Sequence, residues 1–111
     1  MPFEVLKKRA DFLRVGSVNK KVSTKTLVLL AAENEIGIIR VGYTVSKKTS
    51  KLAVERNKIK RRLRAIAREL IPQYAKPKTD YVIIGKRDAL TRNFSDLKGD
   101  LKYALKKLEQ K

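Results

Sequence analysis

Residues 53–64 have the sequence AVERNKIKRRLR, which combines dense positive charge with the apolar spacing of a helix. Apolar side chains recur mostly every three to five residues and predict one buried face; they are Val54, Ile59, Leu63, Ile66, Ala67 and Leu70. The pattern predicts a helix over about 52–71 that ends at Pro72, because a proline ring interferes with continuing the helix. A disordered basic tail would not need this spacing, so the charge is expected on a folded surface.

The charge of this segment is unbalanced. Ten lysines and arginines stand against one acid, Glu55, between Ser46 and Arg68. At about 100° per residue, one arc of the helix beside the apolar face collects five polar side chains: Asn57, Lys60, Arg61, Arg64 and Arg68. The alternative is a solvated face that only keeps the helix soluble, but such faces usually mix charges of both signs.

The whole chain repeats this imbalance, with 28 basic and 11 acidic residues and a net charge of +17. A charge of this size favours association with a polyanion. Nucleic acid is the first candidate and an anionic membrane the second. The 111 residues predict a single RNA-binding domain spanning 1–111.

Several functional classes are disfavoured by what the sequence lacks. It contains no cysteine and no histidine, and therefore no disulfide, no thiolate or imidazole metal ligand and no histidine general base. The acidic residues show no metal-binding spacing, so we expect no catalytic residue and no metal site in this chain. No apolar run approaches the ~20 residues of a membrane span or forms a signal peptide, which favours a cytoplasmic protein.

Outside the basic helix, the pattern alternates between strands and helices. Residues 26–32 (TLVLLAA) and 36–45 are apolar or β-branched runs around a turn at 33–35, which predicts an antiparallel hairpin. Further strands are expected near 20–23 and at 80–85, DYVIIG. Helices are expected at about 8–15, ending at Gly16, and at 96–109, capped by Ser95. This order, α-β-β-β-α-β-α, predicts an α+β sandwich with a mixed four-stranded sheet and three helices.

The central block resembles the bacterial ribonuclease P protein family. A strand ending in VGYTVSKK, residues 41–48, precedes the basic helix segment ERNKIKRRLR, residues 55–64, which matches the family's Arg-Asn-Arg-type motif with Lys58 at its third position. The loop 49–53 reads TSKLA where many members carry Gly-Asn-Ala. The segments LKKRADF at 6–12 and DYVII at 80–84 agree in order, so the resemblance covers nearly the whole chain.

The resemblance implies a subunit of an endoribonuclease holoenzyme whose catalyst is a large RNA. That RNA, with Mg²⁺ bound to it and not to a dedicated protein site, removes the 5′ leader from precursor tRNA. The implied partners are ribonuclease P RNA and precursor tRNA, with no membrane and no required protein partner. A left-handed βαβ crossover, against the usual hand, is also implied. A general RNA- or ribosome-binding protein is the alternative function, because it would share every argument from charge.

Two sets of candidate residues follow. The RNA-binding candidates are Lys47, Lys48, Arg56, Asn57, Lys58, Lys60, Arg61, Arg62, Arg64 and Arg68. The resemblance implies a leader-binding cleft between the first helix and the sheet, for which the candidates are Lys8, Arg9, Phe12 and Tyr43. Phe12 could equally be a core anchor of its helix. Tyr43 alternates with Val41 and Val45 along its strand, so a core position is at least as favoured as the cleft.

Overall fold

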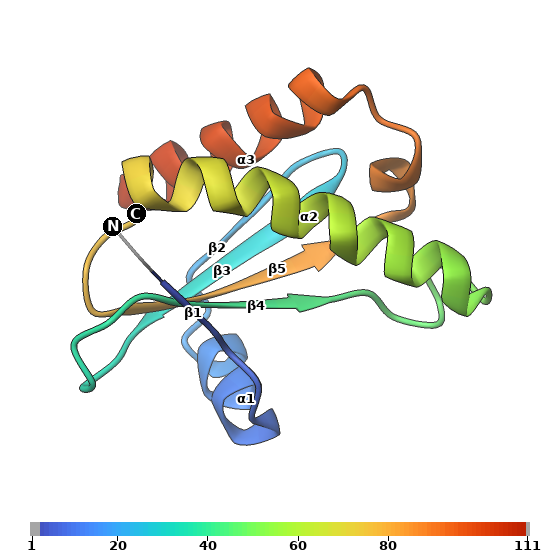
Figure 1. Ribbon diagram of the computed structural model, residues 1–111. Coiled ribbons are helices and arrows are strands. Elements are labelled where there is room, and N and C mark those ends of the chain that lie inside the picture. The colour runs from blue at the N-terminus through green and yellow to red at the C-terminus, as the bar shows by residue number, and fades with distance from the viewer. Residues whose placement is uncertain (1–2, 111) are drawn as a thin grey trace.

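The computed structural model describes residues 3–110, in which a five-stranded mixed sheet carries helices on both faces (Figure 1). The strands are β1 (Glu4–Val5), β2 (Lys21–Ser23), β3 (Leu27–Glu33), β4 (Arg40–Thr44) and β5 (Thr79–Gly85). The helices are α1 (Arg9–Ser17), α2 (Ala53–Tyr74) and α3 (Phe94–Glu109), with a 3₁₀ turn η1 (Arg87–Leu90) before α3. The α+β class and the three helices are therefore confirmed, whereas the sheet has five strands and not four. The additional strand, β1, has two residues and is too short to produce a recognisable alternation.

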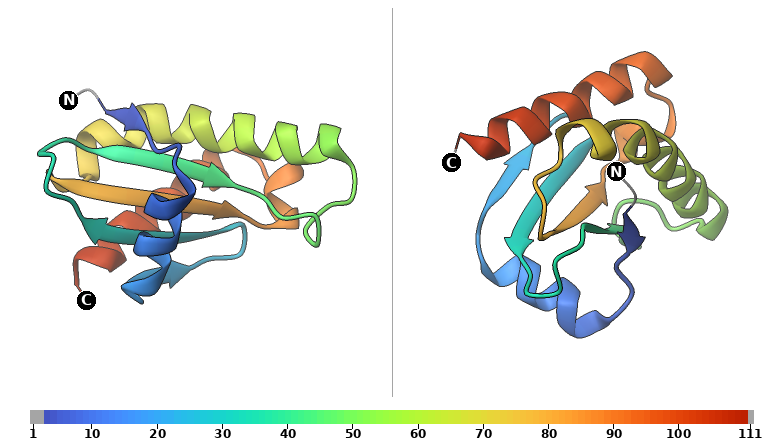
Figure 2. Two further views of the ribbon diagram at one scale, coloured as in Figure 1. Left: turned by 90° about the horizontal axis from the view of Figure 1, so that it is seen from below. Right: turned by 60° about the vertical axis from the view of Figure 1, so that its left-hand side comes forward.

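The helices form two unequal layers. Helices α2 and α3 cover one face of the sheet and α1 crosses the other (Figures 1 and 2). The larger core lies on the α2–α3 side and includes fully buried Leu29, Ile59, Leu63, Ile83 and Leu101. A smaller cluster lies on the α1 side and contains Leu6, Val15, Leu30, Ala32 and Val82. Because β3 and β5 are covered on both faces, their sequences are continuous apolar runs without polar alternation.

The strand order is β1-β4-β5-β3-β2, with β5 at the centre. It pairs in parallel with β4, with Val41 opposite Tyr81, and antiparallel with β3, with Leu29 opposite Ile83. The expected hairpin of residues 26–45 is therefore wrong, because β5 lies between its two strands. Local adjacency predicted the hairpin, but the apolar strand β5, which comes later in the chain, is inserted between the two strands and pairs with both.

Helix α2 connects β4 to β5. Viewed from the α2 side with both strands pointing up, β5 lies to the left of β4 (Figures 1 and 2). The crossover is therefore left-handed, as the resemblance implies and against the general preference. At the end of β5 the helix lies very close to the sheet, since a Cβ placed on Gly85 would be 2.5 Å from Cγ2 of Ile59.

Three helix ends differ from expectation. Helix α2 continues past Pro72 to Tyr74, and the backbone N–H of Ala75 still donates to Ile71 O at 3.0 Å. Pro72 thus removes one hydrogen bond in the last turn, while burial of Ile71 stabilises that turn. Helix α1 runs through Gly16 to Ser17. Helix α3 is capped by Asn93, whose Oδ1 accepts from the Ser95 N–H at 3.0 Å, and not by Ser95.

Within residues 3–110, none of the helices combines the length and the apolar character needed to cross a bilayer.

Candidate nucleic-acid interface

The loop between β4 and α2 is fixed to the first turns of the helix. The Arg56 guanidinium donates to the carbonyls of Ser50 and Lys51 at 2.8 and 2.9 Å. The buried Ser50 hydroxyl donates to Glu55, which also pairs with Arg87 at 3.1 Å. These hydrogen bonds, from Ser50 first and then from Arg87, lower the pKa of the Glu55 carboxyl. The exposed Lys47 and Lys48 therefore lie on a turn whose position relative to α2 is set.

Arg62 is directed into the protein. Its guanidinium donates to the carbonyl of Ala89 in η1 at 2.6 Å and to that of Arg92, just after η1. It is only partly exposed, and it joins α2 to the connection that leads into α3. Arg56 and Arg62 thus make internal contacts that a periodicity argument could not distinguish from free charges.

The remaining candidates on α2 present an uncompensated charge. Asn57, Lys58, Arg61, Arg64 and Arg68 are exposed, and Lys60 is partly exposed. Within residues 3–110, the lysines and arginines among them form no ion pair. We call these six residues, together with Lys47 and Lys48, the basic surface. Repulsion between like charges one helical turn apart costs stability that a bound polyanion would restore.

Tyr43 lies where the basic surface meets the sheet. The Arg64 guanidinium lies over its ring, 5.5 Å from the centroid, a cation–π distance. Burial raises the pKa of the Tyr43 phenol to about 12, although Arg64 and Arg68 act in the opposite direction. The ring packs against the α2-side core together with Val41 and Val45, as the alternation along the strand predicts.

Phe12 lies on the other face of β4. A Cβ placed on Gly42 would be 2.5 and 2.7 Å from two carbons of the Phe12 ring, so the ring sits directly on the glycine. Gly42 and Tyr43 are consecutive residues of a strand, so a side chain at position 42 would point to the opposite face of the sheet from the ring of Tyr43. The ring is partly buried against the smaller core, so Phe12 is both a core contact and a groove residue.

A groove of about 450 Å³ lies between α1 and the sheet. Its lining residues are Lys7, Arg9, Phe12, Gly16, Leu30, Tyr43, Thr44, Val82 and Ile84. It brings together three of the four cleft candidates, whereas Lys8 is exposed outside the lining and accepts the first N–H bonds of α1 with its carbonyl. Lys7 was not among the candidates, although it is in the same basic run. Strand β1 pairs with β4 only at Arg40 and Val41, so the edge of β4 is uncovered farther along, where the groove lies.

A buried carboxylate joins α1 to the sheet. Asp80 is fully buried and accepts hydrogen bonds from Arg40 at 2.8 and 2.7 Å, from the Asn34 amide at 2.8 Å, and from Arg14. Burial opposes ionisation, but the hydrogen bonds from Arg40 and Asn34 hold the pKa of Asp80 below its ordinary value. The same contact with Asp80 raises the pKa of Arg40. We call Asp80 and its donors, with Asp11, the Asp80 cluster.

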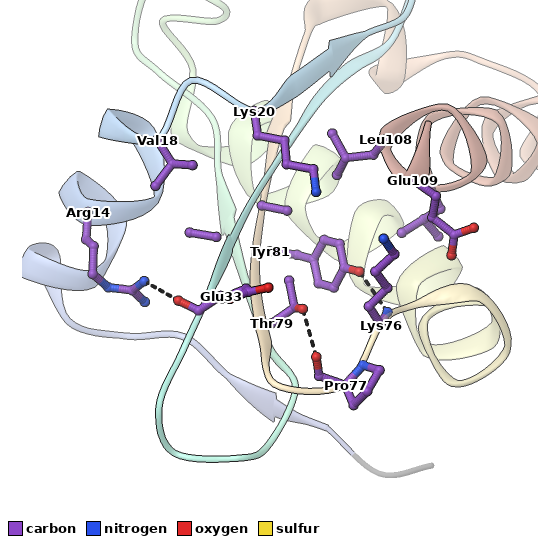
Figure 3. A pocket seen from close by; sticks show the side chains of 13 residues that line it. Arg14, Val18, Lys20, Glu33, Lys76, Pro77, Thr79, Tyr81, Leu108 and Glu109 are labelled. Atoms are coloured by element: carbon purple, nitrogen blue, oxygen red, sulfur yellow. Dashed lines mark hydrogen bonds between the residues drawn. The ribbon is translucent and has the colours of Figure 1, made fainter. Parts of the chain in front are cut away.

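Sequence analysis did not find this cluster. Its partners are separated from Asp80 by 40 to 66 positions along the chain, which leaves no spacing to recognise. Arg14 reaches it from α1 and also donates to the carbonyl of Glu33 at 2.9 Å (Figure 3). Within residues 3–110, no three acidic side chains gather in an arrangement that could hold a metal ion.

Comparison with known proteins agrees with this geometry. The family model for ribonuclease P matches residues 2–109. The ribonuclease P protein component of Paramagnetospirillum magneticum is 43% identical over 108 residues, covering 93% of this chain and 80% of the relative. That of Ruegeria pomeroyi is 42% identical, covering 94% and 85%.

Solved structures show the same fold. The RNase P protein from Staphylococcus aureus superposes with a TM-score of 0.76 at 30% identity, covering 96% of this chain and 94% of that one. The RNase P protein from Thermotoga maritima gives 0.76 at 26% identity, covering 96% of each chain. The match extends from one end of the fold to the other and includes both the basic helix and the groove-forming α1, and this chain therefore belongs to the ribonuclease P protein family.

Proposed function

We propose that this chain is the protein subunit of the ribonuclease P endoribonuclease, a single RNA-binding domain of residues 1–111 that works in the cytoplasm. It binds the catalytic RNA through the basic surface and holds the 5′ leader of precursor tRNA in the groove between α1 and the sheet. The observation that carries the proposal is the position of Tyr43, whose ring lies under Arg64 while its strand forms part of the groove wall. One edge of the sheet thus joins a surface suited to structured RNA and a groove suited to a single strand.

The division of labour follows from the side chains available. The chain has neither histidine nor cysteine, and the described acids form no metal-binding group. Cleavage is therefore assigned to the RNA, together with the Mg²⁺ ions that the RNA binds. The protein neutralises phosphates and positions the leader, which a charge of +17 supports.

The ten RNA-binding candidates divide into two roles. Arg56 and Arg62 donate to backbone carbonyls and hold the β4–α2 loop and η1 in place. The basic surface supplies the direct contacts with phosphate or sugar. Arginine at 61, 64 and 68 offers a planar fork for bidentate phosphate binding.

Arg61→Ala and Arg64→Ala should each weaken binding to ribonuclease P RNA and reduce its salt dependence. Each lost phosphate contact is expected to lower the slope of log K against log salt by roughly 0.7–0.9. Filter binding or fluorescence titration between low and high salt measures this slope. Lys107→Ala, which removes one exposed charge from α3, is the matched control and should leave the slope nearly unchanged. Equal slopes for wild type and both arginine variants would show that the α2 face is only solvated.

Phe12→Ala should weaken binding of leader-bearing precursor tRNA by the reconstituted holoenzyme. Loss of one stacked base contact costs about 1–3 kcal/mol, and mature tRNA, which lacks the leader, should be affected little. Because the ring also contacts the smaller core, thermal stability must be measured with both affinities. Phe12→Leu retains apolar bulk without an aromatic face and should keep more of the stability while still losing the leader preference. Equal losses of affinity for the two tRNAs would argue against the leader groove.

A further inference from the structure

We propose that the Asp80 cluster sets the width and orientation of the leader groove, and that Arg14 is a positioning residue for leader recognition. This inference rests on the proposed function, because it concerns the same groove. Arg14 would not contact the leader. It would act by holding α1, and with it Phe12 and Arg9, at a fixed place beneath the edge of β4.

Helix α1 has few apolar anchors of its own. It has nine residues, of which only Val15 is fully buried, and no side chain caps its first turn. Leu13 is exposed on its outer side, and Phe12 is only partly buried. A helix this short has little intrinsic stability, so its orientation depends on tertiary contacts.

The polar contacts supply that orientation. Arg14 donates to Asp80 on β5 and to the carbonyl of Glu33 on β3, so one side chain joins α1 to two strands. Asp11, one turn earlier, accepts from Arg40 on β4 at 3.4 Å. Helix α1 is therefore held to three adjacent strands of the sheet through its polar side chains.

Phe12 lies between these two attachment points in the sequence. Its ring rests on Gly42, two residues beyond Arg40 on the same strand, and Arg40 is held by both Asp80 and Asp11. The strand that forms the groove wall and the helix that forms its floor are thus fixed by one carboxylate. Rotation of α1 about Val15 would move Phe12 and Arg9 relative to β4 without unfolding the sheet.

Arg14→Gln tests this in the reconstituted holoenzyme. It leaves Asp80 with its bonds from Arg40 and Asn34, so the sheet retains its buried pair while α1 loses its bridge. We measure the ratio of affinities for leader-bearing precursor and mature tRNA. That ratio is expected to fall roughly threefold to tenfold, which lies within the range of about twofold to thirtyfold for mutations that alter coupling without touching the ligand.

Two companion variants separate positioning from charge and from stability. Arg92→Gln removes the same charge and the ion pair with Asp100 at 3.2 Å, far from the groove, and should leave the ratio unchanged even if the melting temperature falls. Arg14→Lys keeps the charge but replaces the two guanidinium nitrogens that reach Glu33 O and Asp80 separately by a single ammonium nitrogen on a different stem, so the ratio should still fall more than twofold.

The outcomes distinguish this inference from the proposed function. An unchanged ratio in folded Arg14→Gln, while Phe12→Ala loses leader preference, would overturn the positioning role alone. Full restoration by Arg14→Lys, or an equal fall with Arg92→Gln, would overturn it as well. A wild-type holoenzyme whose preference for leader-bearing tRNA does not respond to Phe12→Ala would instead remove the leader groove on which the inference rests.

Discussion

Asp80→Ala is expected to lower the free energy of unfolding by about 3 kcal/mol or more, because breaking a buried ion pair leaves its partners uncompensated. The carboxylate is fully buried and has donors from α1, β4 and the loop after β3. Arg40 would keep its charge with only 19% of its side chain exposed and would lose its principal acceptor. Urea or guanidinium unfolding of the purified protein measures the effect.

Asp100→Ala is the matched control for that variant. Asp100 accepts from Thr26 at 2.7 Å and pairs with Arg92, but it remains 15% exposed and its arginine 30% exposed. Water can replace part of these contacts, so the loss should be about 1–2 kcal/mol. A smaller loss for Asp80→Ala than for Asp100→Ala would contradict the central place given to the Asp80 cluster.

The same carboxylate predicts a pH dependence. The folded-state pKa of Asp80 lies below its ordinary value, so the unfolded chain takes up this proton at a higher pH than the folded protein. Its contribution to stability is therefore complete above the unfolded pKa of about 3.9 and is lost as pH falls through the folded pKa. Asp80→Asn should remove this part of the acid transition.

Gly85→Ala should destabilise the protein by about 1–3 kcal/mol, the usual cost of overpacking a core. The new methyl group would lie 2.5 Å from Cγ2 of Ile59 and 3.1 Å from side-chain atoms of Leu63 and Val45. Ile59 is β-branched and fully buried, so it cannot swing aside. Relief requires the start of α2 to rise from the sheet, which would also displace the basic surface.

Gly99→Ala makes the same chemical change with the opposite expected sign. Gly99 is in α3 with nothing within 4 Å of an added Cβ, and alanine is favoured over glycine in helices by about 0.5–1 kcal/mol. Thermal unfolding of both variants checks the pair. Retention of wild-type stability by Gly85→Ala would mean that α2 is less tightly seated than the contact distances indicate.

The sequence predicted most helices and strands because each carries a local pattern. The apolar spacing from Val54 to Leu70 located α2, and the runs 26–32 and 80–85 located β3 and β5. Pairing of the strands is not local. No pattern in the sequence of β3 or of β4 indicates that β5 lies between them. The family resemblance, and not periodicity, indicated the hand of the crossover.

The candidate site was predictable to a similar degree. Charge and helical phase identified the exposed arc around Arg61 and Arg64, whose arginines make no ion pair within the described residues 3–110. The same reasoning grouped Arg56 and Arg62 with them. In the sequence, an arginine that donates hydrogen bonds to backbone carbonyls cannot be told from one that is free to bind phosphate. Strand alternation placed Tyr43 on the same face as Val41 and Val45, and the structure shows that this is the α2 face. Only coordinates could place Phe12 on Gly42 across the strand.

The central position of β5 also orders events during synthesis. Strands β2, β3 and β4 and all of α2 leave the ribosome before β5, yet β3 and β4 are not paired with each other, because β5 lies between them. Until residue 85 has emerged, the pair β2–β3 and the strand β4 are therefore not joined into one sheet. The long cationic helix α2 also lacks part of the apolar surface against which it packs. The closing step must bring together segments distant in the chain, which is intrinsically slow. The dense positive charge of α2 would keep the helix hydrated, and its repulsion of like charges would limit association with other copies of the nascent chain until β5 has been synthesised.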